Sequence, residues 1–223
     1  MGGSPLVARS LLLTLRVDGP AAVVRRIRIR LFGLEQRYIF IRHLQAPPTP
    51  VEFPFEINGI VVRYMEESDL TNMLLRRSQP RDLPQPTEAV VATRAGQIVG
   101  AAWYTSSVTP EQPWYHAVEP HLILPARATA SFFVVPGDKA AAWAIAKSAT
   151  DRLATTGVRT IVGVVASHNK PSVLMSRLLG GRMVAQMSVR HRFGYSTTVV
   201  AVVSTDQDNA VTTSTKAVRR RER

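Results

Sequence analysis

The apolar positions in the first half of the chain predict two β-hairpins. The first joins residues 53–57 to 60–65 across Asn58-Gly59, a pair that suits a tight turn in which both residues take a positive φ. The second joins residues 88–94 to 97–105 across Ala95-Gly96. An antiparallel sheet is therefore expected to begin near residue 53.

The second half of the chain alternates apolar strands with helices. Residues 129–135 and 160–166 are continuous apolar runs, which is typical of strands covered on both faces. Between them, residues 138–156 predict a helix whose apolar face holds Ala142, Ile145, Ala146, Ala149 and Leu153. The other predicted elements are helices over residues 66–77 and 171–179 and strands over 183–192 and 195–204.

The two ends of the chain have weaker patterns. Residues 23–30 suit either a strand or a helix, whereas residues 37–44 are β-rich and predict a strand. Prolines cluster near residue 50 and predict a linker. We therefore expect a basic N-terminal extension over residues 1–50, a folded domain over 51–204 and a disordered basic tail over 205–223.

The composition excludes several kinds of site. The chain has no cysteine, so disulfides, zinc–thiolate sites, iron–sulfur clusters and cysteine nucleophiles are excluded. None of its five histidines forms a pair with the spacing of a helical metal site, and we expect no metal. The absence of cysteine fits a reducing compartment, so a cytoplasmic protein is expected.

The net charge of +12 is concentrated at the two ends of the chain. Residues 1–30 hold six arginines and one aspartate, and residues 216–223 hold five basic residues and one glutamate. Basic ends can bind nucleic acid or an anionic membrane surface. A solvated terminus is the alternative, and the sequence leaves both readings open.

Two segments of the second half resemble the GNAT superfamily of N-acyltransferases. Residues 132–144 read FFVVPGDKAAAWA and are similar to the family's strand ending in Val-x-Pro, with its following Arg/Gln-x-x-Gly-x-Gly/Ala loop. Residues 161–172 read IVGVVASHNKPS and resemble the family's next strand and the Asn-x-x-Ser/Ala turn that opens its last helix. Residues 178–184 resemble the Leu-Gly-Phe-x-x-Val ending, with Gly181 in place of the aromatic residue. The predicted order of elements is also the family's order.

The resemblance implies an α/β (α+β) fold with a central mixed, mostly antiparallel sheet flanked by helices. It also implies an acyl-CoA-dependent N-acyltransferase, in the first instance an N-acetyltransferase, that moves the acyl group of acetyl-CoA or another acyl-CoA to an amine. A helix N-terminus offers unpaired N–H groups and a positive dipole end to the pyrophosphate of such a ligand. The positions that match the family's acyl-CoA contacts are Val134, Val135, Lys139, Ala140, Ala142, Ala144, Asn169 and Ser172.

Several residues depart from the family's pattern. Lys139 stands where Arg or Gln is usual, and Ala140 and Ala142 stand where glycine is usual. Alanine brings a methyl group close to a phosphate and disfavours a positive φ. Ser176 occupies the position of the tyrosine that protonates the leaving thiolate in many members. These departures favour a second hypothesis, a non-catalytic GNAT-like module that binds a partner.

The acyl transfer implied by the resemblance needs a group that removes a proton from the attacking amine. Glu119 and His121 lie before the strand at residues 129–135, and Tyr104 ends the strand before that, so these three are the candidates. With Trp114 and Tyr115, Tyr104 is also expected to line an acceptor pocket. A solvated loop acid, a surface histidine and core aromatic rings are the alternatives.

Overall fold

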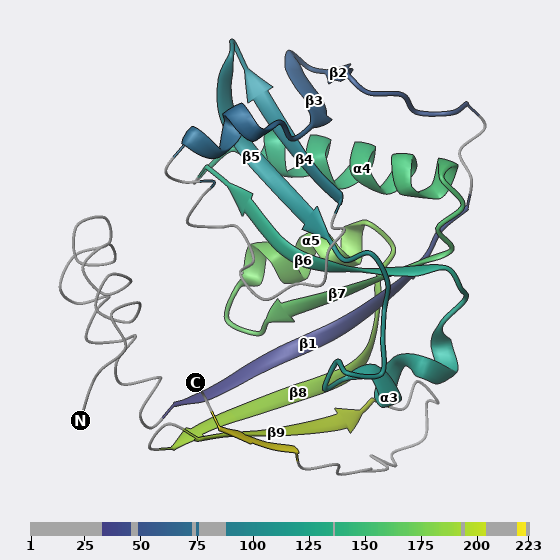
Figure 1. Ribbon diagram of the computed structural model, residues 1–223, viewed down its shortest axis with the longest axis vertical. Coiled ribbons are helices and arrows are strands. Elements are labelled where there is room, and N and C mark those ends of the chain that lie inside the picture. The colour runs from purple at the N-terminus through teal and green to yellow at the C-terminus, as the bar shows by residue number, and fades with distance from the viewer. Residues whose placement is uncertain are drawn as a thin grey trace, which may run out of the picture.

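The computed structural model describes residues 33–45, 49–72, 75, 88–135, 137–192, 195–203 and 218–221. Its strands form one ten-stranded sheet in the order β10-β9-β8-β1-β7-β6-β5-β4-β3-β2 (Figure 1). The strands are β1 (Leu34–His43), β2 (Phe55–Ile57), β3 (Ile60–Tyr64), β4 (Glu88–Arg94), β5 (Gln97–Tyr104), β6 (Ala126–Val134), β7 (Thr160–Ala166), β8 (Arg182–Arg192), β9 (Tyr195–Val202) and β10 (Val218–Arg221). The helices are η1 (Glu67–Thr71), α3 (Tyr115–Val118), η2 (Glu119–His121), α4 (Lys139–Thr155) and α5 (Lys170–Leu178).

The mixed, mostly antiparallel sheet with flanking helices confirms the expected fold class. Every neighbouring pair of strands is antiparallel except β6 and β7, which run parallel. From β3 onward, the elements follow the order predicted from the sequence, with α3 and η2 added between β5 and β6 and β10 added after β9. No helix among the described residues is both long enough and apolar enough to span a bilayer.

Both predicted hairpins are confirmed. β2 and β3 turn at Asn58 and Gly59, where φ is 52° and 71°, and β4 and β5 turn at Ala95 and Gly96, where φ is 47° and 77°. Ala95 adopts the left-handed backbone conformation, which is disfavoured for residues that carry a Cβ. β2, β3, β4, β5 and β6 therefore form a meander in which neighbours along the chain are neighbours in the sheet.

The strand predicted over residues 37–44 is confirmed as β1, but it does not belong to a separate extension. β1 lies between β7 and β8 and pairs antiparallel with both. Ile39, Phe40 and Ile41 are buried, so this strand is covered on both faces. The boundary expected at residue 50 is therefore corrected, because β1 is a central strand of the sheet. The segment over residues 23–30 lies outside the described residues.

The carbonyl oxygen of Ser176 gives a physical reason for the glycine at position 181. A Cβ on Gly181 would lie 3.6 Å from Phe40 Cβ and 2.6 Å from the carbonyl oxygen of Ser176. Contacts to backbone below 3 Å are not tolerated, so α5 and β8 meet too closely for a side chain here.

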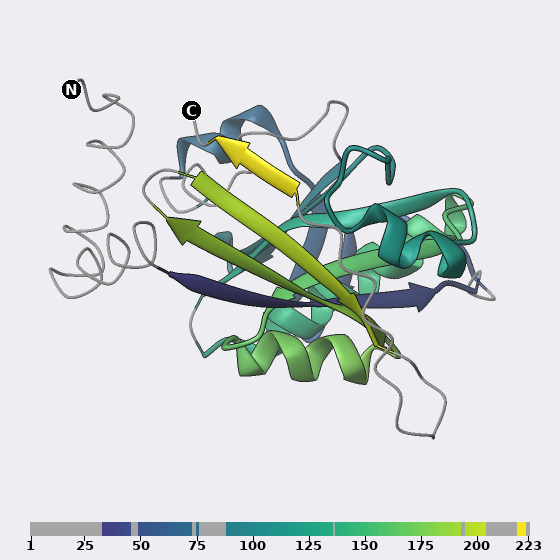
Figure 2. The ribbon, with the colours of Figure 1, turned by 90° about the horizontal axis from the view of Figure 1, so that it is seen from below.

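Helices cover both faces of the sheet. α4 packs on β3, β4 and β5, and α5 packs on β7, whereas α3 contacts β8 and β9 on the other face. Figure 2 shows α5 and α3 on opposite sides of β1. Gly100 allows the close approach of α4, because a Cβ there would lie 2.5 Å from Ile145 Cδ1 and 2.9 Å from the carbonyl oxygen of Phe133.

Three predicted segments differ in detail from the structure. The helix expected over residues 66–77 is a short 3-10 turn, η1, within the described residues. The face of α4 that packs most closely includes Ala141 and Ala144, while the predicted Ala142 is only half-buried at the exposed start of the helix. In the basic tail, β10 pairs with β9, and residues 204–217 lie outside the description.

Candidate functional site

The two parallel strands separate soon after they begin. β6 and β7 pair only at Ala126↔Thr160, Arg127↔Ile161 and Ala128↔Val162. Beyond this point β6 stays with β5 as far as Val134↔Gly100, and β7 stays with β1 as far as Ala166↔Arg37. Each strand thus follows its outer neighbour, and the two diverge in a V (Figure 1).

A β-bulge marks the point of divergence. On β6, Thr129 faces Tyr104 and Ser131 faces Trp103, which leaves Ala130 as the extra residue. Bulges bend the strand that carries them and increase its local twist. The bulge therefore gives a physical cause for the turn of β6 away from β7.

The divergence leaves backbone groups without a partner strand. The N–H of Val135 donates to Val99 on β5, and that of Ser167 donates to Gln36, which lies in β1. Backbone groups alternate between the two edges of a strand. The N–H and C=O of Val134 on β6 therefore face the space between the strands, whereas the C=O of Ala166 at the end of β7 accepts a hydrogen bond from the N–H of Asn169 at 2.9 Å.

The N-terminus of α4 lies at the open end of the V and is capped by its own chain. The side chain of Asp138 accepts a hydrogen bond from the N–H of Ala141 at 2.9 Å. The same carboxylate forms an ion pair with Arg94 on β4 at 2.9 Å. The negative charge of Asp138 thus lies at the helix end where the sequence analysis expects a pyrophosphate.

The predicted pyrophosphate loop is the first turn of this helix rather than a separate loop. Lys139 and Ala140 are exposed, Ala142 is half-buried, and Ala144 is buried against the sheet. Because this backbone is helical, the alanines in place of glycines carry no backbone strain. Lys139 is the basic side chain of this turn, directly after the cap.

The second predicted cofactor segment forms the start of α5, also at the open end of the V. Asn169 caps α5, and its side-chain oxygen accepts from the N–H of Ser172 at 3.2 Å. The hydroxyl of Ser176, at the position of the family's tyrosine, donates to the carbonyl of Ser172 at 2.9 Å within the helix. This hydroxyl is therefore engaged in the helix itself.

The three predicted catalytic residues are not brought together. Tyr104 is buried in the core under α4, and burial, with the charge of Glu88, raises the pKa of its phenol far above the usual value. A phenol in this state keeps its proton near neutral pH and is a poor base. The ring is part of the core, which is the alternative that the sequence analysis gave to a functional role.

Glu119 and His121 lie in η2, which follows α3 on the opposite face of the sheet from α4. Glu119 is half exposed, and its carboxylate lies 3.6 Å from His116 Nδ1. Burial, followed by Arg182 and His43, lowers the pKa of His121 and favours the neutral imidazole that can accept a proton. The neutral imidazole of His121 is the form that a base requires.

Trp114 is buried and packs with α3 in the core on this face, where Tyr115 is partly buried. Tyr104 belongs to the other face. The three aromatic residues expected to line one acceptor pocket therefore lie in two different core clusters. That expectation is corrected: the rings fill the core on both sides of the sheet.

The sequence reading missed three polar residues that the fold places at notable positions. They are Arg94 beside the α4 cap, Arg42 on the α4-facing side of β1, and the half-buried Glu88 opposite Tyr104. Burial raises the pKa of Glu88, while Arg127 and Arg152 oppose the shift. The alternation of Glu88 with the buried Val90 and Ala92 is the sequence signal that it points inward.

Comparison with known proteins gives likenesses in structure alone. No family model and no curated protein matches the sequence. Among solved structures, a GCN5-related N-acetyltransferase from Sphaerobacter thermophilus is 14% identical with a TM-score of 0.45, covering 75% of this chain and 55% of that one. A GCN5-related N-acetyltransferase from Kribbella flavida is 13% identical with a TM-score of 0.42, covering 74% and 60%. A putative GNAT-family acetyltransferase from Novosphingobium aromaticivorans is 15% identical with a TM-score of 0.43, covering 70% and 63%. The chain thus spans less than two thirds of each of these structures.

Proposed function

We propose that this protein is an acyl-CoA-dependent N-acyltransferase, most simply an N-acetyltransferase, whose ligand lies between β6 and β7. The observation that carries the proposal is the divergence of these strands after three paired positions. The amide groups of an extended pantetheine arm can pair with an open strand edge, as an added strand does. The backbone of Val134 offers such an edge.

The two helix starts at the open end of the V support the same assignment. α4 follows β6 and α5 follows β7, so both N-termini and the exposed Lys139 lie where the strands are furthest apart. Helix N-termini favour phosphate groups. The acceptor amine and the length of the acyl chain stay open, and a cytoplasmic location stays a prediction.

Calorimetric titration of the full chain with acetyl-CoA tests the proposal. Lys139→Glu should weaken binding by about tenfold or more, because an attractive charge near the phosphates becomes a repulsive one. Arg159→Glu is the matched control, since it makes the same charge change at an exposed residue just before β7, at the closed end of the V. Absence of binding at millimolar acetyl-CoA, or equal losses in both variants, would contradict the proposal.

A non-catalytic module of the same fold is the second candidate, and the α4 cap favours it. The Asp138 carboxylate repels a phosphate while satisfying Ala141. Asp138→Asn keeps a capping oxygen and removes the charge. If the protein is such a module, the wild type should bind no acetyl-CoA, and Asp138→Asn combined with Ala140→Gly and Ala142→Gly should create binding.

An anionic partner for the basic ends is a separate proposal. Most of those residues lie outside the described part of the chain, although Arg219, Arg220 and Arg221 belong to β10. Binding of RNA or anionic vesicles should fall steeply as salt rises. Weak binding at low salt would remove this partner.

A further inference from the structure

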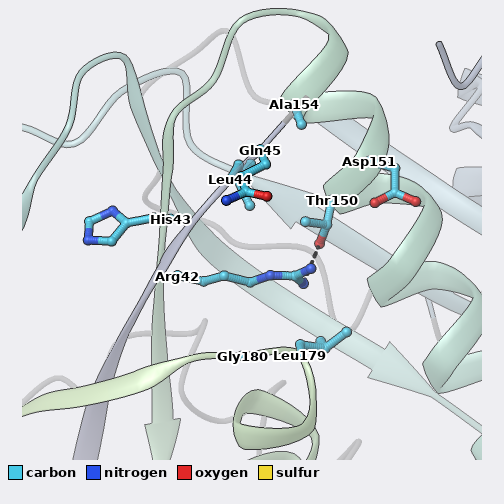
Figure 3. Close-up of a pocket in the computed structure, with 9 residues that line it drawn as sticks. All are labelled: Arg42, His43, Leu44, Gln45, Thr150, Asp151, Ala154, Leu179 and Gly180. Carbon is cyan, nitrogen blue, oxygen red and sulfur yellow. Dashed lines mark hydrogen bonds between the residues drawn. The ribbon is translucent and has the colours of Figure 1, made fainter. Parts of the chain in front are cut away.

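A small polar cavity lies near the C-terminal half of α4. It has a volume of about 290 Å³ and is bounded by the end of β1, one side of α4 and the turn after α5. The residues around it are Arg42, His43, Leu44, Gln45, Thr150, Asp151, Ala154, Leu179 and Gly180 (Figure 3). This volume is close to the lower limit for pockets that hold small ligands.

Arg42 is the central polar group of this cavity. Its side chain runs from β1 toward α4, and Nη1 donates to Thr150 Oγ1 at a long 3.5 Å (Figure 3). Burial lowers the pKa of this guanidinium, which reports the cost of removing the charge from water. Within the described part of the chain, Arg42 forms no ion pair.

Asp151 attracts the Arg42 guanidinium electrostatically but forms no ion pair with it. Asp151 is one helical turn from Lys147 and forms an ion pair with that residue. Figure 3 shows Arg42 extending from β1 toward Thr150, while the His43 ring extends from the other side of β1. The guanidinium therefore retains donors that can receive a ligand, and Gln45 adds an exposed amide nearby.

We propose that this cavity binds a small molecule through a carboxylate or phosphate group held by Arg42. The planar guanidinium can donate two parallel hydrogen bonds to either group. Leu44, Ala154 and Leu179 provide apolar walls for the remainder of the molecule. Because the cavity lies toward the C-terminal end of α4 and the acyl-CoA assignment concerns its N-terminal end, the two proposals stand or fall separately.

Titration of the full chain with inorganic phosphate and with succinate tests this site. Arg42→Gln should weaken binding of the preferred probe by about ten- to a hundredfold, the range expected for loss of hydrogen bonds to a charged group. Arg190→Gln, a control at an exposed arginine of β8 that pairs with Leu34 at the other end of β1, should change it less than twofold. Preference for phosphate or for succinate identifies the ligand group.

A charge series at Gln45 tests the same site without touching a buried residue. Gln45→Lys should tighten and Gln45→Glu should weaken binding, each by about two- to fivefold, as expected for one charge at the rim of a hydrated cavity. Neither exposed substitution threatens the fold. The proposal is overturned if neither probe binds at millimolar concentration, or if the two Gln45 variants bind equally.

Discussion

The two halves of the sheet are built in different ways. From β2 to β6, each strand pairs with the next strand along the chain, and two-residue turns join β2 to β3 and β4 to β5. From β7 to β9, the sheet is completed by β1, which comes from the beginning of the described chain. The first half is therefore built from consecutive strands, whereas the second half depends on the insertion of β1. The V lies where these two constructions meet.

Phe40→Ala in β1 should lower the stability of the protein more than any other substitution considered for the two halves. Phe40 is buried at 3% exposure, between elements of the second half. Loss of a buried aromatic ring should lower the free energy of unfolding by about 3–5 kcal/mol. Urea denaturation measures this change, and a loss below about 1 kcal/mol would mean that β1 is not essential to the core.

A pair of glycines tests close packing in each half. Gly181→Ala should cost about 2–3 kcal/mol, because its Cβ would press on a backbone oxygen of α5 at 2.6 Å. Gly100→Ala should cost a similar amount, because its Cβ would lie 2.9 Å from the carbonyl oxygen of Phe133 as well as 2.5 Å from Ile145 Cδ1. Gly163→Ala is the control, because its nearest neighbour, Phe40 Cβ, is at 4.0 Å. Thermal denaturation should place the control closest to wild type.

The ion pair between Arg63 and Asp69 in the first half should lose its stabilising effect in acid. Asp69 accepts two hydrogen bonds of 2.8 Å from Arg63 and is 7% exposed. Hydrogen bonding to Arg63 lowers the pKa of Asp69 below its ordinary value of 3.8. The stabilisation is therefore complete above that value and is lost as pH falls through the lower pKa of the folded state.

Asp69→Asn should lower the free energy of unfolding by about 1–2 kcal/mol at pH 7. The difference between wild type and variant should shrink as pH is lowered from 5 toward 2, as measured by urea midpoints. A difference that stays constant over this range would mean that the Asp69 charge contributes nothing.

The smallest effect is expected at the hairpin turns. Ala95→Gly should stabilise the protein by up to about 1 kcal/mol, since a Cβ at φ 47° is disfavoured. Asn58→Gly is the matched control in the other hairpin, because asparagine tolerates its φ of 52°. Equal shifts in melting temperature for the two variants would contradict this account.

The sequence predicted the locally built parts of the sheet better than the place of the inserted strand β1. The bounds of β4 and β7 and the turns of both hairpins are recoverable from local pattern, since φ preferences and apolar runs are local properties. The position of β1 is not recoverable in this way. A β-rich run reports that a strand forms, but the choice of neighbours depends on contacts far along the chain.

The candidate site was predicted in part for a similar reason. Residues near Lys139 and Asn169 begin the two helices at the open end of the V, as their motifs indicated. The ion pair between Asp138 and Arg94 joins residues 44 positions apart and has no local signature. The hydrogen bond from Arg42 to Thr150 spans 108 positions and likewise has no local sequence signal.

The central position of β1 also bears on the order in which the chain can fold during synthesis. His43 and Thr160, which are partners in the sheet, are separated by 117 positions, and β8 follows later still. A ribosome therefore releases β1 long before either of its neighbours exists. Contacts of such long range slow folding, and until they form both edges of an apolar strand stay open to other chains. A nascent chain halted before β7 should consequently be a good substrate for chaperones that hold extended apolar segments.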